Sequence, residues 1–158
     1  MQTLPPDIVK ILNARLQDEY NAERFYVAAS IWCDLNGFPL TSDAMVDEYH
    51  DERKHQHKLQ KHASDWGVML SLPSEIPTPT FTSWNDIIKQ AYDMELALWT
   101  KYNADAYKVM EYPSCYKFLQ KFIAIQDESV VYYADIIKMA GGISDKFQLL
   151  MLEKKIFK

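Results

Sequence analysis

The proline-containing segment Val68–Thr82 constrains the fold of this chain more than any other feature. It holds Pro73, Pro77 and Pro79, and it cannot be helical because proline lacks the N–H that a helix needs. Long stretches with few Pro or Gly lie on either side of it. About 15 residues of extended chain can reach ~50 Å, whereas a helix over residues 42–67 would be about 39 Å long. The segment could therefore run the full length of a helical bundle as a crossover.

Start and stop signals divide the rest of the sequence into four long helices and a short one. The predicted helices cover residues 7–34, 42–67, 84–111, 113–140 and 145–156. Their starts are marked by residues that cap or open helices, namely Asp7, Thr41-Ser42-Asp43, Ser83 with Asp86, Pro113 and Ser144. Since the other two connections between the long helices are short, helices one and two, and helices three and four, are expected to be antiparallel neighbours. The sequence predicts one all-α domain over residues 1–158, a four-helix bundle with one long crossover and a short C-terminal fifth helix.

Composition argues against several classes of protein. A net charge of -5 is unlike that of a nucleic-acid-binding surface. No apolar run approaches ~20 residues, so no membrane span is expected, and the first residues lack a signal-peptide pattern. Cys33 and Cys115 form no motif and are expected to be reduced thiols in a cytoplasmic protein.

The polar run Asp47–His57 contains Glu52-Arg53-Lys54-His55. Residues three apart lie on one face of a helix, so Glu52 and His55 could hold one metal ion together. Alone, this spacing often occurs by chance on charged helices, and a solvated helix face would be the better interpretation. Its meaning depends on whether other helices supply polar residues at a matching depth.

Positions that recur at alternating steps of three and four are expected to face the core of such a bundle. In all four long helices these positions are mainly apolar or aromatic, yet each helix has a polar residue near the middle of the row. The polar residues are Glu19, Glu52 with His55, Glu95, and Gln126 with Ser129. If helices two and three start from the same end, Glu52 and Glu95 each lie about ten residues in and share a level.

Carboxylates in a dry core cost several kcal/mol each unless they are paired. No Lys or Arg occupies these rows near the acids, so a bound cation is the expected partner. Three carboxylates and one imidazole suit iron or manganese better than the thiolate-rich sites of structural zinc. Glu52 could bridge two ions, with Glu19 and His55 completing one site and Glu95 the other.

The whole set resembles the ferroxidase centre of the non-haem ferritins: Glu19, Tyr26, Glu52-x-x-His55, Glu95 and Gln126-x-x-Ser129. Leu12-Asn13 and Trp32-Cys33 are similar to bacterial ferritins, and the run from His50 to His55 is similar to animal heavy chains. The resemblance covers nearly the whole chain. It implies a homo-oligomer, a hollow 24-subunit cage that oxidises Fe(II) with dioxygen and stores ferric mineral.

The resemblance also implies residue roles. Glu19, Glu52 and His55 would hold the first iron, and Glu52 and Glu95 the second. Gln126 would orient a water or an oxygen species beside the second site.

Further residues are expected to act around these ligands. Tyr26 would hydrogen-bond near the centre or supply an electron, although a core tyrosine with a satisfied hydroxyl would look the same. Ser129 is expected beside the ligands, and Asp51 and Glu128 remain as candidates for a third iron site. Arg53 stands where haem-binding ferritins carry a Met, so no haem is expected.

Two other functions remain open. One is a di-iron oxidase or peroxidase that acts on another substrate, and the other is a cage subunit without catalysis. Stable di-iron cofactor proteins carry a second Glu-x-x-His where this chain has Gln126-Asp127-Glu128-Ser129, which counts against the first. A weakly held second iron instead suits a site whose product must leave.

Overall fold

The computed structural model describes residues 3–157, which are helical apart from turns and connections. The helices are α1 (Pro6–Leu35), α2 (Pro39–Asp65), α3 (Trp84–Lys108), α4 (Pro113–Ala140) and α5 (Lys146–Ile156). The described residues contain no strand, so the prediction of an all-α chain is confirmed. The chain divides into two compact units, one ending at Thr80 and the other beginning at Phe81. Each unit contains one pair of long helices.

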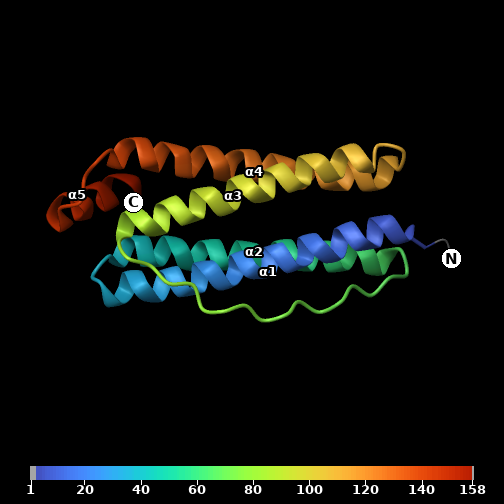
Figure 1. The fold of residues 1–158 in the computed structure, drawn as a ribbon, viewed down its shortest axis with the longest axis horizontal. Coiled ribbons are helices and arrows are strands. Elements are labelled where there is room, and N and C mark those ends of the chain that lie inside the picture. The colour runs from blue at the N-terminus through green and yellow to red at the C-terminus, as the bar shows by residue number, and fades with distance from the viewer. Residues whose placement is uncertain (1–2, 158) are drawn as a thin grey trace. The chain divides into compact units, whose positions relative to one another are not determined.

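The first unit is an antiparallel pair, α1 and α2, joined by a tight turn (Figure 1). Gly37 adopts a positive φ of 77°, which a residue without a Cβ tolerates, and the Phe38 N–H donates to the Cys33 carbonyl at 2.8 Å. The faces between the helices are mainly apolar. Their buried side chains include Leu12, Leu16, Tyr26 and Ala29 of α1, and Met45, Leu59 and Ala63 of α2.

The connection after α2 returns along α1 as an extended segment (Figure 1). Gln17 on α1 donates to the Ser74 carbonyl at 2.9 Å and accepts from the Ser74 N–H at 2.8 Å. Asn13 accepts from the Ser71 N–H at 2.8 Å. These side chains satisfy backbone groups that have no helical partner, so they fix the segment as a polar strap on α1.

Two predicted helix starts in this unit are wrong. Asp7 does not cap α1, because the cap position is Pro5 and Asp7 lies inside the first turn. The second helix begins at Pro39 rather than at residue 42, since a proline fits the first turn of a helix without losing a hydrogen bond. Ser42, predicted within the cap, instead donates its hydroxyl to the Ser30 carbonyl on α1 at 2.9 Å.

The second unit contains the antiparallel pair α3 and α4 with α5 after them. Tyr102 and Phe122 stack with ring centroids 5.1 Å apart in the core of this unit. Leu149 and Leu152 are the buried apolar residues of α5. Asn85 near the start of α3 donates to the Ile143 carbonyl at 2.7 Å, which ties the link before α5 to α3.

The caps of the second unit follow the sequence signals with one exception. The Ser83 hydroxyl accepts from the Asp86 N–H at 3.0 Å, and the Asp86 carboxylate accepts from the Thr82 N–H at 2.9 Å, as expected of a capping box displaced by one residue. The short helix α5 is capped by Asp145, which accepts from the Gln148 N–H at 3.0 Å, and not by Ser144.

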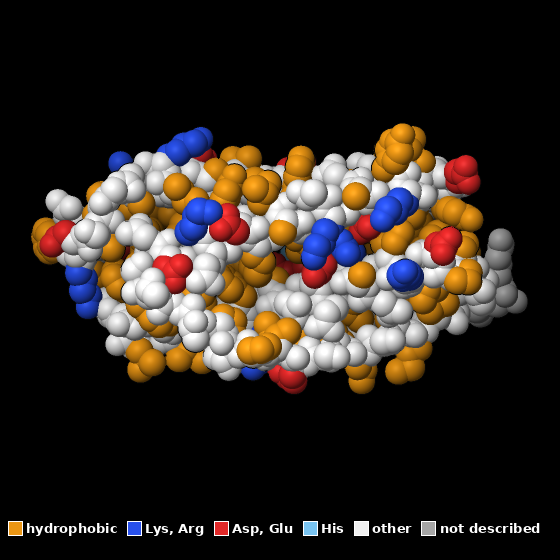
Figure 2. All heavy atoms as spheres, in the orientation of Figure 1, with side chains coloured by type: hydrophobic (Ala, Val, Ile, Leu, Met, Phe, Trp, Pro, Cys, Tyr) orange, Lys and Arg blue, Asp and Glu red, His pale blue; other side chains and the backbone are white. Residues whose placement is uncertain are grey.

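The surface carries charges of both signs close together. On the face seen in Figure 2, Lys and Arg side chains lie among Asp and Glu side chains. Lys89 and Asp93 on α3, for example, form an ion pair at 2.6 Å. No helix within residues 3–157 combines the length and the hydropathy that a membrane span requires.

Candidate metal centre

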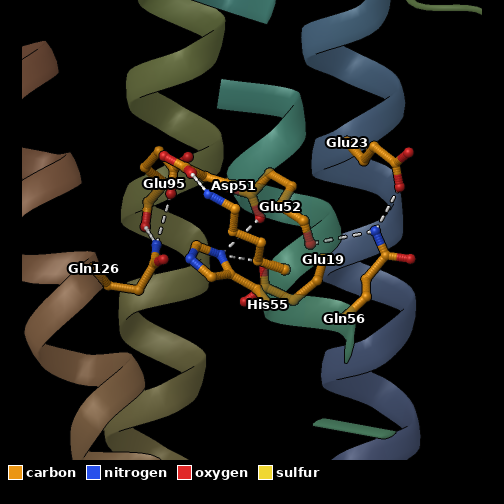
Figure 3. A network of polar contacts seen from close by, with 9 residues as sticks. Glu19, Glu23, Asp51, Glu52, His55, Gln56, Glu95 and Gln126 are labelled. Carbon is orange, nitrogen blue, oxygen red and sulfur yellow. Dashed lines mark hydrogen bonds and ion pairs between the residues drawn. The ribbon is translucent and has the colours of Figure 1, made fainter. Parts of the chain in front are cut away.

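Three of the predicted ligands meet in the first unit. Glu52 and His55 lie three residues apart on α2 and point toward Glu19 on α1 (Figure 3). His55 Nδ1 lies 3.2 Å from Glu52 Oε2 and 3.5 Å from Glu19 Oε2. One ligand atom from each residue lies within 4.8 Å of the others. The helix spacing of Glu52 and His55 and the pairing of α1 with α2 therefore produce one compact donor set.

This donor set has the chemistry of a cation site. Glu19 and Glu52 are 0% and 2% exposed, and His55 is 8% exposed. Two buried carboxylates facing each other are unfavourable without a positive charge, and a divalent ion between them would offset both. Two oxygen donors with one imidazole nitrogen fit iron or manganese, so the residues present are suited to the ion that the sequence predicts.

The other two predicted ligands meet in the second unit. Gln126 on α4 donates its amide to the Glu95 carboxylate on α3 at 2.7 Å, and to the Glu95 carbonyl at 3.2 Å (Figure 3). Both side chains are buried. In this geometry Gln126 holds the Glu95 carboxylate in place, whereas the resemblance implied that it would orient a water or an oxygen species.

The remaining predicted residues lie in different settings. Tyr26 is fully buried on α1, with its ring edge-to-face against Phe25. Ser129 is half-buried. Asp51 and Glu128 are exposed, and Asp51 forms an ion pair with Lys54 at 3.3 Å. Exposed carboxylates bind cations weakly, so neither acid has the setting of the buried ligands.

Sequence reasoning missed a second polar group in the first unit, formed by Glu23, Arg53 and Gln56. Glu23 accepts from Arg53 at 2.8 Å and from Gln56 at 2.6 Å. The expectation about Lys and Arg concerned the inward rows beside Glu19, Glu52 and Glu95, and it did not anticipate an arginine that reaches Glu23 from outside the rows. Arg53 lies in a polar run, which is typical of a solvated helix face, and its side chain is indeed 65% exposed. The side chain is nevertheless long enough for its guanidinium to reach α1. The only available signal was the position of Glu23 in the inward row, one turn after Glu19.

The sequence of this chain is similar to those of bacterial ferritins and ferritin-like proteins. The chain is 26% identical over 155 residues to a probable bacterial non-heme ferritin-like protein of Haemophilus influenzae, covering 96% of this chain and 94% of that protein. It is 24% identical over 138 residues to a bacterial non-heme ferritin of Escherichia coli O6:H1, covering 85% of this chain and 83% of that protein.

Solved structures show the fold. An open pore ferritin from the archaeon Archaeoglobus fulgidus superposes with a TM-score of 0.85 at 24% identity, covering 98% of both chains. A form of the same archaeal ferritin engineered to be closed gives 0.84 at 23% identity, covering 98% of this chain and 96% of that one. The chain thus has the ferritin fold, a four-helix bundle with a short C-terminal helix. Residues 9–140 also match the ferritin-like domain family, and the chain belongs to the ferritin family.

Proposed function

We propose that this protein stores iron and oxidises Fe(II) with dioxygen at a di-iron ferroxidase centre. The observation that carries the proposal is the convergence of Glu19, Glu52 and His55, whose buried ligand atoms lie within 4.8 Å of one another. Membership of the ferritin family supports the storage role.

We further propose that the two helix pairs form one ferritin-like domain, so that Glu95 and Gln126 complete the centre begun by the first unit. The family match supports this, because residues 9–140 span both units. Glu19 and His55 would then bind one Fe(II), Glu95 would bind another, and the Glu52 carboxylate would bridge the two. Held side by side, two Fe(II) substrates would each give one electron to dioxygen, which would take up two protons and leave as hydrogen peroxide, and the Fe(III) product would leave for storage.

The protein side chains would contribute binding, orientation and exclusion of water. Buried carboxylates favour the higher charge of Fe(III) over Fe(II), which assists the loss of an electron. The amide of Gln126 keeps the Glu95 carboxylate aimed before the second ion arrives. Tyr26 is buried on α1, seven residues after Glu19. In this proposal its hydroxyl hydrogen-bonds near the centre or supplies an electron.

The protein is proposed to act as a homo-oligomeric cage of 24 subunits in the cytoplasm. Large apolar side chains are exposed near the end of α3 and on α5, and they would be covered by neighbouring subunits. Tyr107 is 79% exposed and Phe147 is 71% exposed. Light scattering of the native particle tests this assembly, and a monomer or dimer would contradict it.

The activity is tested by adding Fe(II) to metal-free protein in air and following both dioxygen consumption and Fe(III) absorbance. The parent should show a rapid phase above the rate without protein, and Glu52→Ala should lack it. Asp47→Ala is the matched control, because Asp47 is an exposed acid on the same helix. A Glu52→Ala rate equal to the parent rate would reject the assigned centre. No rapid phase in the parent would indicate a subunit without catalysis.

A further inference from the structure

Glu23 lies on α1 one helical turn after Glu19 and is 7% exposed. Its carboxylate accepts three hydrogen bonds from α2. One oxygen takes Arg53 Nη2 at 2.8 Å and Arg53 Nε at 3.1 Å, and the other takes Gln56 Nε2 at 2.6 Å (Figure 3 shows the bond to Gln56). Gln56 Nε2 also approaches the Glu52 carbonyl at 3.4 Å. The carboxylate of Glu23 is thus fully engaged by protein groups.

The two buried acids of α1 therefore have different partners. The charge of Glu23 is neutralised by Arg53, and both of its oxygens already accept from donors. Glu19 instead turns its carboxylate toward His55, at 3.5 Å. Arg53 and Gln56 keep Glu23 from competing with Glu19 as a metal ligand.

We propose that Glu23, Arg53 and Gln56 form a clasp between α1 and α2 that determines how tightly Glu19, Glu52 and His55 bind a divalent cation. The three clasp residues are positioning residues, since they act through the ligands. The inference rests on the function proposed above, in which those ligands bind Fe(II).

The sequence positions explain why the clasp would affect the ligands. Arg53 directly follows Glu52 on α2, and Gln56 directly follows His55. A shift of α2 that lengthens the bonds to Glu23 would move both ligands on α2 away from Glu19. Metal–ligand distances lie within about 0.2 Å of their typical values, so a small change in the separation of α1 and α2 weakens metal binding.

Gln56→Leu is the most direct test, because it replaces a buried hydrogen-bond donor with an apolar side chain of similar volume and leaves the net charge unchanged. Metal-free protein would be titrated with Co(II) in the absence of oxygen, and the ligand-field absorption would report affinity and coordination geometry. Loss of a group that orients metal ligands typically lowers affinity about 10–100-fold, and we expect a loss in this range with an altered spectrum.

A double variant that exchanges the side chains of residues 23 and 56 distinguishes an effect of the clasp from an effect of general packing. Gln56→Glu alone would set two carboxylates against each other and should weaken Co(II) binding. Adding Glu23→Gln restores one carboxylate and one amide at the parent net charge, and should recover most of the lost affinity. If Gln56→Leu fails to assemble, this swapped variant decides the question. Binding no better than in the Gln56→Glu single variant would overturn the proposal.

Lys54→Ala is the matched control. Lys54 lies between Arg53 and His55 on α2 but is exposed and pairs with Asp51, so this variant should bind Co(II) as the parent does. Parent-like affinity and spectrum in a folded Gln56→Leu variant would reject the clasp while leaving the proposed function standing. Failure of the parent itself to bind Co(II) would reject the proposed metal centre.

Discussion

Glu52→Gln should stabilise the metal-free protein although it removes a predicted metal ligand. The carboxylates of Glu19 and Glu52 are buried and face each other, with ligand atoms within 4.8 Å. A glutamine has nearly the same shape as the glutamate but carries no charge. The substitution therefore relieves like-charge repulsion and part of the desolvation penalty without opening a cavity.

The size of this effect follows from the geometry. The ligand atoms of Glu19 and Glu52 lie within 4.8 Å of each other, and two unit charges at that upper limit repel by about 3 kcal/mol at an effective dielectric constant of ~20. We expect a gain of about 1–3 kcal/mol, because the change also removes the favourable contact of Glu52 with His55. For a chain of this length each kcal/mol shifts the thermal midpoint by about 2–4 °C.

Glu23→Gln should have the opposite effect, which makes it an informative control. Glu23 is also buried, but its charge is compensated by Arg53, and Gln56 donates to it at 2.6 Å. Losing these charge-assisted hydrogen bonds should lower stability by about 1–2 kcal/mol, a value reduced because Arg53 is largely exposed.

The assay is thermal unfolding followed by circular dichroism at one heating rate, with a chelator present and then with saturating Co(II). In chelator the midpoints should rank Glu52→Gln above the parent and the parent above Glu23→Gln. A ligand at about 100 times its Kd stabilises the protein that binds it by about 2.7 kcal/mol, so Co(II) should remove the advantage of Glu52→Gln. If Glu52→Gln unfolds below the parent in chelator, the buried acids are not repelling each other and the reasoning fails.

Three further outcomes follow from local structure. Ser83→Ala removes the hydroxyl that accepts from the Asp86 N–H at the start of α3, and it should lower stability by about 1 kcal/mol in chemical denaturation. Burial raises the pKa of the Cys115 thiol to about 11, so alkylation by iodoacetamide at pH 8 should be slow in the native protein and fast once it is unfolded. Gln17→Leu breaks both bonds to Ser74, and limited proteolysis should then cut the strap after α2 faster than in the parent, whereas equal rates would show that these bonds do not hold it.

Much of the fold could be predicted from the positions of the prolines and from the spacing of polar residues at helix starts. The prolines of the segment Val68–Thr82 exclude a helix there, and the extended return along α1 follows. The capping pair Ser83 and Asp86 predicts the start of α3 because the signal is local. The start of α2 at Pro39 was missed, since a proline after a turn can either end the connection or open the helix, and packing on α1 decides between them.

Part of the candidate ligand set could also be predicted from local sequence spacing. Glu52 and His55 share a helix face for reasons of helical geometry alone, and the sequence therefore determined this pair. Glu19 and Glu23 both fall in the buried arc of α1, because an arc wide enough to bury a helix includes residues four apart.

Only the tertiary structure decided which of these two acids faces His55. That choice depends on the rotation of α1 against α2 and on an arginine long enough to reach across from a solvated position. Hydrophobic periodicity describes one helix at a time and carries no information about the side chains of its neighbour. The sequence thus determined which residue types lie at the right depth, and the packing of α1 on α2 decided which of them pair with each other.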